Sequence, residues 1–154
     1  MSFFNLFRKS EIECPRCLGK GFVDWEDINR LNKQLKWTPA PCAYCNATGK
    51  TDKEMLSKVS VDCTYLTIDL PDLEVEKIKN GDPETIAKGK QRELFVDNLI
   101  KYAENLYVTQ NMDAENIADL YLNTQEEKAH FSVNKQELIK YIQGIIELKK
   151  AKLN

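Results

Sequence analysis

Cysteine is the residue with the most specific chemistry in this chain of 154 residues, which contains five cysteines and one histidine. Four of the cysteines form two Cys-x-x-Cys pairs, Cys14 with Cys17 and Cys42 with Cys45. This spacing lets one tight turn present both sulfur atoms to the same ion, and a tetrahedral structural zinc site requires four thiolates. The two pairs therefore predict one structural zinc ion, whose closed coordination sphere leaves no position for an activated water.

Small residues follow the two pairs at matching positions. Gly19 and Gly21 follow the first pair. After the second pair, Gly49 stands at the position that corresponds to Gly21, and Ala47 at the position that corresponds to Gly19. Glycine admits the positive φ that such turns need, so the backbone N–H groups there can fold back towards the sulfur atoms.

Residues 12–50 resemble the DnaJ-type cysteine-rich domain, whose repeat is Cys-x-x-Cys-x-Gly-x-Gly. Residues 14–21 match the repeat in full, and residues 42–49 match it with one glycine replaced by alanine. Four repeats bind two zinc ions in that family, so the resemblance implies half of the domain and one zinc ion. A J-domain would also need a His-Pro-Asp tripeptide, but His130 is followed by Phe131 and Ser132. We therefore do not expect a complete J-protein co-chaperone.

Two other interpretations of the cysteines remain. A thiol-disulfide oxidoreductase would use one exposed Cys-x-x-Cys pair with a depressed pKa, whereas the pairs here are twofold and followed by glycine. Iron held by four thiolates is chemically feasible, because tetrahedral sulfur ligation suits both metals. The fifth cysteine, Cys63, lies on the apolar phase of an alternating segment, and we expect it to be a buried core residue.

The elements that must position the cysteines can be predicted from the apolar spacing. Between the two pairs, near-helical spacing of apolar residues and an N-cap at Asp24 predict a helix that extends to Trp37 and ends before Thr38-Pro39. Alternation of apolar and polar residues predicts a strand over residues 59–70.

After Pro71 the chain is typical of helices. The segment from Asp72 to Lys79 predicts a short helix ended by Asn80-Gly81. Start signals for three further helices stand at Asp82-Pro83, at Asp113 and at Asn134. The sequence therefore predicts a mainly helical α+β fold, with a four-cysteine zinc module at 10–55 and a strand region plus helical C-terminal part at 56–154.

Charge and hydropathy limit the cellular setting. The 22 basic and 24 acidic side chains give a formal net charge of −2, which provides no general attraction to nucleic acid. No apolar run approaches the roughly 20 residues that cross a bilayer. At the N-terminus four apolar residues precede Arg8 and Lys9, the reverse of the order in a secretory signal. We expect a cytoplasmic protein without a transmembrane segment, whose N-terminal residues dock on its own body or on a partner.

The sequence contains no recognisable constellation of catalytic residues, so we expect a protein that is not an enzyme. The leading hypothesis is a zinc-binding, chaperone-like adaptor that uses its zinc finger module for protein interaction with a partner or client. The expected surface combines the helix from Trp25 to Trp37 with Phe22 and Tyr44. The alternative is a nucleic-acid-binding, zinc-ribbon-like regulator that uses tryptophan stacking and the basic residues Arg8, Lys9, Arg16, Lys20, Arg30, Lys33 and Lys36.

Overall fold

The computed structural model describes residues 10–124 and 134–154. The chain divides into two compact units, an N-terminal unit of residues 1–93 and a C-terminal unit of residues 94–154, with the division inside helix α4. Most of the described residues lie in helices and the strands are few and short, so the predicted mainly helical α+β class is confirmed. The predicted zinc module, 10–55, lies within the N-terminal unit. His130 and the apolar N-terminal residues lie outside the described residues.

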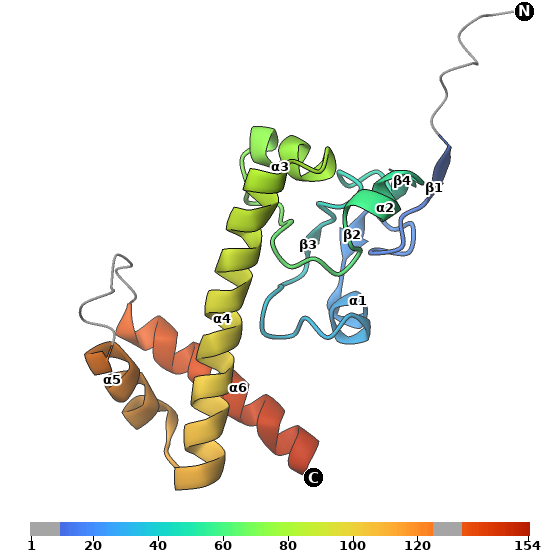
Figure 1. Cartoon of the computed structure of the whole chain (residues 1–154). Helices are drawn as coiled ribbons and strands as arrows, with labels where there is room; N and C mark the ends of the chain where they lie inside the picture. The colour runs from blue at the N-terminus through green and yellow to red at the C-terminus, as the bar shows by residue number, and fades with distance from the viewer. Residues whose placement is uncertain (1–9, 125–133) are drawn as a thin grey trace, which may run out of the picture. The chain divides into compact units, whose positions relative to one another are not determined.

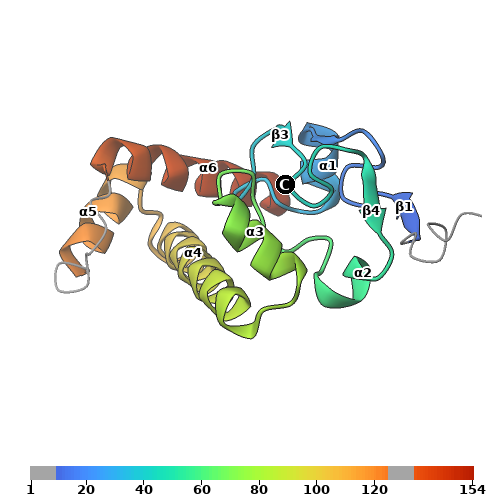
Figure 2. The same ribbon diagram turned by 90° about the horizontal axis from the view of Figure 1, so that it is seen from above.

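Two antiparallel strand pairs bring the cysteine pairs together. Strand β1 (Glu11–Glu13) pairs with β4 (Lys50–Asp52), and β2 (Phe22–Val23) pairs with β3 (Ala40–Pro41). Both Figure 1 and Figure 2 show β1 and β4 side by side. In the chain, β1 and β2 lie on either side of the first two cysteines, and their partner strands β4 and β3 lie on either side of the second two. Strand pairing therefore holds the two cysteine pairs opposite one another.

Helix α1 (Trp25–Arg30) is shorter than the sequence pattern predicts. Its N-cap is Asp24 as predicted, and a reciprocal hydrogen bond with Asp27 completes a capping box. The predicted continuation to Trp37 is wrong, because the helix ends at Arg30 and Asn32 adopts a left-handed φ of 57°. A left-handed residue stops an α-helix, and asparagine tolerates that conformation better than most residues.

The strand predicted over residues 59–70 is also wrong, because this described segment consists of turns and loop after the short helix α2 (Met55–Lys58). Its apolar residues do point inwards, since Val59, Cys63 and Leu66 are buried. Because this loop faces the core, its sequence has the apolar pattern of a strand. Its carbonyl groups, however, accept hydrogen bonds from the side chain of Arg16 instead of pairing with a neighbouring strand.

One apolar core unites the N-terminal unit. The cysteine pairs share it with the fully buried side chains of Ile28 and Leu66, and with Ile78 of helix α3 (Asp72–Lys79). The short helix predicted over Asp72–Lys79 is thereby confirmed. Gly89, in the first part of α4 (Pro83–Gln110), lies against the ring of Tyr65, where a Cβ atom would come within 2.6 Å of Tyr65 Cγ.

The C-terminal unit is formed by the rest of α4 with α5 (Ala114–Thr124) and α6 (Lys135–Leu153), and α5 packs against α6. The predicted helix starts are confirmed: the side chain of Asp113 accepts a hydrogen bond from Asn116 N, and that of Asn134 accepts one from Gln136 N.

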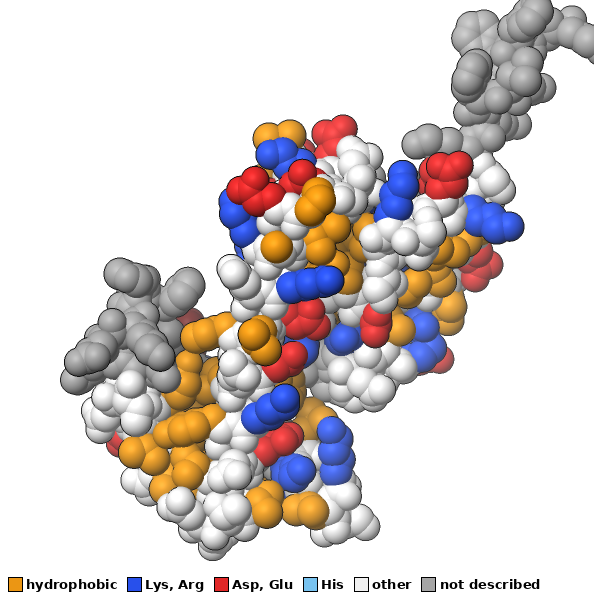
Figure 3. All heavy atoms as spheres, in the orientation of Figure 1, with side chains coloured by type: hydrophobic (Ala, Val, Ile, Leu, Met, Phe, Trp, Pro, Cys, Tyr) orange, Lys and Arg blue, Asp and Glu red, His pale blue; other side chains and the backbone are white. Residues whose placement is uncertain are grey.

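On the face drawn in Figure 3, basic and acidic side chains are interspersed. None of the described helices combines the length and the apolar character needed to cross a membrane.

Candidate metal centre

Four sulfur atoms converge in the N-terminal unit. The Sγ atoms of Cys14, Cys17, Cys42 and Cys45 all lie within 4.8 Å of one another, and the four side chains are between 0% and 5% exposed. Two of these distances join one cysteine of each pair: 3.9 Å between Cys14 and Cys42, and 3.8 Å between Cys17 and Cys45. The structure therefore brings all four predicted ligands together in one buried cluster.

The spacing of the sulfur atoms fits a tetrahedral metal ion. With a metal–sulfur bond of about 2.3 Å, the edge of a regular tetrahedron of sulfur atoms is about 3.8 Å. The distances of 3.9 Å and 3.8 Å match this edge and are far longer than the roughly 2.05 Å of a disulfide bond. The four cysteines are thus free thiols that are positioned to bind a metal ion.

The two cysteine turns, 14–21 and 42–49, repeat the same hydrogen bonds. Gly21 N donates to Cys17 Sγ and Gly49 N donates to Cys45 Sγ, both at 3.2 Å. The turns also exchange backbone bonds, from Cys14 N to Gly49 O at 2.9 Å and from Cys42 N to Gly21 O at 3.0 Å. N–H donors aimed at sulfur favour the thiolate, which is the form that binds metal.

Glycine is required where the two turns meet. A Cβ atom on Gly49 would lie 2.3 Å from Gly19 O, and one on Gly21 would lie 2.5 Å from Ala47 O. Both glycines also have positive φ, 78° and 75°. Ala47, which stands where the first turn has Gly19, adopts a φ of 63° and retains the turn at the cost of strain.

Three of the four thiols have shifted pKa values. A hydrogen bond from the Cys42 thiol lowers the pKa of Cys14 to about 5. The same bond holds the proton of Cys42 and raises its pKa, and burial adds to that effect. Burial also raises the pKa of Cys17. Four buried thiolates repel one another, so a bound cation is what allows them all to lose their protons.

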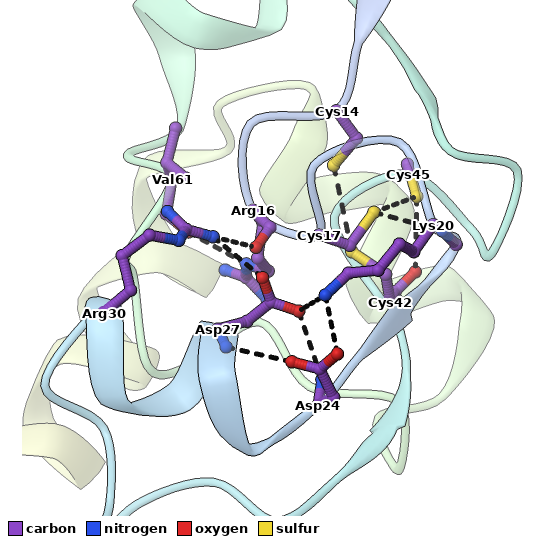
Figure 4. A network of polar contacts seen from close by, with 11 residues as sticks. Cys14, Arg16, Cys17, Lys20, Asp24, Asp27, Arg30, Cys42, Cys45 and Val61 are labelled. Carbon is purple, nitrogen blue, oxygen red and sulfur yellow. Dashed lines mark hydrogen bonds and ion pairs between the residues drawn. The ribbon is translucent and has the colours of Figure 1, made fainter.

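An ion-pair network joins the first cysteine turn to α1 (Figure 4). The carboxylate of Asp27 is buried, and its two oxygens accept from Lys20 Nζ at 2.8 Å and from Arg30 Nη2 at 3.0 Å. Lys20 Nζ also lies 2.7 Å from Asp24, and Arg30 donates to Arg16 O at 2.8 Å. The network fixes the backbone between Cys14 and Cys17 from outside the metal cluster.

Arg16 is the side chain that replaces the predicted strand pairing of residues 59–70. It is only 3% exposed, and its guanidinium donates to the carbonyl oxygens of Val61, Cys63 and Leu66 at 2.8–3.0 Å. Its Cζ also lies 4.5 Å from the centre of the Trp37 ring. This role of Arg16 could not be predicted from the sequence, because no local pattern links Arg16 to carbonyl groups some 45 to 50 residues away.

The aromatic surface expected around the module differs from the prediction. Trp37 and Tyr44 are buried, at 8% and 1% exposure, and the Tyr44 hydroxyl donates to Val59 O at 2.8 Å. Both rings therefore serve the core. Phe22 and Trp25 are exposed as expected, at 45% and 54%.

A small cavity of about 120 Å³ lies beside Trp37 and is lined also by Arg16, Val23 and Leu66. This volume is well below the roughly 300–1,000 Å³ of ordinary ligand pockets, so the cavity is too small for a cofactor.

No family model, curated protein or solved structure matches the chain. The DnaJ-type resemblance therefore stays a prediction that rests on the residues of the two cysteine turns.

Proposed function

We propose that the chain is a non-enzymatic protein-interaction module in which one zinc ion, bound by Cys14, Cys17, Cys42 and Cys45, is a structural element. The observation that carries this proposal is the closed, buried cluster of four sulfur atoms at tetrahedral spacing. Four protein ligands fill the coordination sphere of zinc and leave no position for substrate or water. Zinc is proposed over iron because two Cys-x-x-Cys pairs are the usual ligand set of structural zinc sites.

The burial of the cysteines argues against a thiol-disulfide oxidoreductase. Reactive cysteines lie in partially exposed environments, where a substrate sulfur can reach the thiolate. The most exposed of the four ligands here is Cys45, at 5%. A role in holding the fold is therefore favoured over a redox role.

The positions of the basic residues argue against the nucleic-acid alternative. Arg16 is buried among carbonyl groups, and Lys20 and Arg30 both pair with Asp27. Lys36 lies 3.8 Å from Glu93. Basic residues that are buried or paired in this way leave little positive field for a phosphate backbone.

Exposed apolar side chains next to the metal cluster support a protein partner. Leu18, in the first cysteine turn, is 51% exposed, and Phe22 and Trp25 follow it closely in the chain. Tryptophan and other aromatic side chains supply much of the binding energy at protein interfaces. A rigid metal-bound turn would hold these side chains in place before a partner arrives, which lowers the entropic cost of binding.

Co-purification from the native cell with zinc-loaded variants tests this proposal. Trp25→Ser removes an exposed aromatic side chain beside the metal cluster, and Leu73→Ser removes an exposed apolar side chain of α3, which is 62% exposed, as a control. We expect the same partner with the wild type and with Leu73→Ser, and its loss with Trp25→Ser at an unchanged zinc content. Equal recovery of that partner by all three proteins would contradict the proposed surface.

A further inference from the structure

The filled metal centre would carry a negative charge that the surrounding chain must offset. Four thiolates and one divalent ion have a net charge of −2, and this inference rests on the proposed binding of zinc. The ligands are buried, and a buried charge is costly unless charged or polar groups compensate it. The N–H groups of Gly21 and Gly49 help to stabilise the sulfur atoms but bring no net charge.

Arg16 and Lys79 are two cations that are placed to offset this negative charge. Arg16 lies between Cys14 and Cys17 in the chain and is buried. Neither Arg16 nor Lys79 forms an ion pair with a carboxylate among residues 10–124 and 134–154. Other basic residues near the first cysteine turn, Lys20 and Arg30, are paired with aspartates.

Lys79 reaches the second cysteine turn from the last residue of α3. Its Nζ donates to Asn46 Oδ1 at 2.7 Å, and Asn46 directly follows Cys45. The preceding residue, Ile78, is fully buried in the core that contains the cysteines. Burial lowers the pKa of Lys79, whereas the nearby thiolates, Cys45 first among them, favour its charged form. The ammonium group is thus held within electrostatic reach of the sulfur cluster.

We propose that Lys79 is a positioning residue of the metal centre, whose ammonium group offsets part of the −2 charge and ties α3 to the second cysteine turn through Asn46. Metal loading and the docking of α3 are then coupled. A neutral residue at position 79 leaves the four ligands in place but makes a dianionic centre harder to form.

Competition for zinc with a chromophoric chelator tests the proposal on the full chain. Lys79→Gln removes the charge, Lys79→Arg retains it, and Lys77→Gln removes an exposed charge from the same helix as a control. Loss of a residue that supports metal ligands typically weakens metal binding by about 10- to 100-fold. Because Lys79 is partly exposed, we expect the lower figure, about tenfold, for Lys79→Gln at low salt.

The salt dependence and the Lys79→Arg variant distinguish an effect of charge on zinc affinity from an effect of packing. We expect the loss in Lys79→Gln to shrink at high salt, Lys79→Arg to retain most of the zinc affinity, and Lys77→Gln to match the wild type. Equal zinc affinity of Lys79→Gln and Lys77→Gln at both salt concentrations would overturn the inference. A loss that is independent of salt and is not rescued by arginine would also overturn it. Failure of the wild type itself to bind zinc would instead refute the proposed function.

Discussion

Replacing Gly49 by alanine tests the packing of the two cysteine turns most sharply. The new Cβ would lie 2.3 Å from Gly19 O and 3.0 Å from Gly19 C, which are backbone atoms that cannot rotate away. Gly81→Ala is the matched control, because Gly81 has nearly the same φ, 80° against 78°, but has nothing within 4 Å of the position of a Cβ. The two variants share the backbone strain and differ in the steric clash.

The expected magnitudes follow from these two contributions. A left-handed conformation costs an ordinary residue about 1–2 kcal/mol, and this is the destabilisation expected for Gly81→Ala. Gly49→Ala adds an overpacking cost of about 1–3 kcal/mol, because the turns must move apart by about 1 Å to restore a normal contact. We therefore expect Gly49→Ala to lower the free energy of unfolding of the N-terminal unit by about 2–5 kcal/mol.

Urea denaturation followed by tryptophan fluorescence measures this difference. Both tryptophans, Trp25 and Trp37, belong to the N-terminal unit, and a fixed concentration of free zinc keeps the contribution of the metal constant. If Gly49→Ala and Gly81→Ala destabilise the protein equally, the close approach of the two turns is not what requires glycine, and the packing argument fails.

Three further predictions concern other parts of the chain. Ala47→Gly should raise the stability of the N-terminal unit by about 0.5–1 kcal/mol in the same denaturation assay, because it relieves a positive φ; an unchanged or lower stability would argue against strain at this position. Arg16→Lys should cost about 3 kcal/mol or more, since the compact ammonium group cannot replace the planar fork that donates to three carbonyl groups at once. The exposed Arg92→Lys should change stability by less than about 0.5 kcal/mol, and equal effects of the two arginine variants would refute the role of Arg16. Burial raises the pKa of Tyr141 to about 12, so the folded state favours the neutral phenol. The resulting stability is complete below pH 10 and should be lost as the pH rises from about 10 to about 12, to a smaller extent in Tyr141→Phe, as followed by circular dichroism.

Local signals predicted those elements whose ends are set by neighbouring residues. The helix over Asp72–Lys79 and the N-cap at Asp24 match the structure because capping depends on residues within one turn. The cysteine spacing likewise indicates that each turn presents its own pair of sulfur atoms, and the strand pairs then bring the two turns together.

Contacts between distant residues account for the errors. The alternating pattern at 59–70 correctly indicates buried side chains at Val59 and Cys63, but it does not reveal that the carbonyl groups there accept hydrogen bonds from the guanidinium of Arg16 instead of from a neighbouring strand. Burial of Asp27 is equally hidden, because it depends on Lys20 and Arg30 reaching the same carboxylate. Such tertiary contacts override local propensity.

Metal content per chain is the most direct measure of whether the four cysteines bind one zinc ion. Protein purified under reducing conditions without chelator, and analysed by elemental mass spectrometry, should contain one zinc ion per chain. Cys14→Ser and Cys45→Ser should each lose the zinc together with the protease resistance of residues 12–50, whereas Cys63→Ser should retain both. Wild-type protein that holds no metal after incubation with zinc, or Cys14→Ser and Cys45→Ser proteins that keep a full equivalent of zinc, would show that the four cysteines do not form a zinc site.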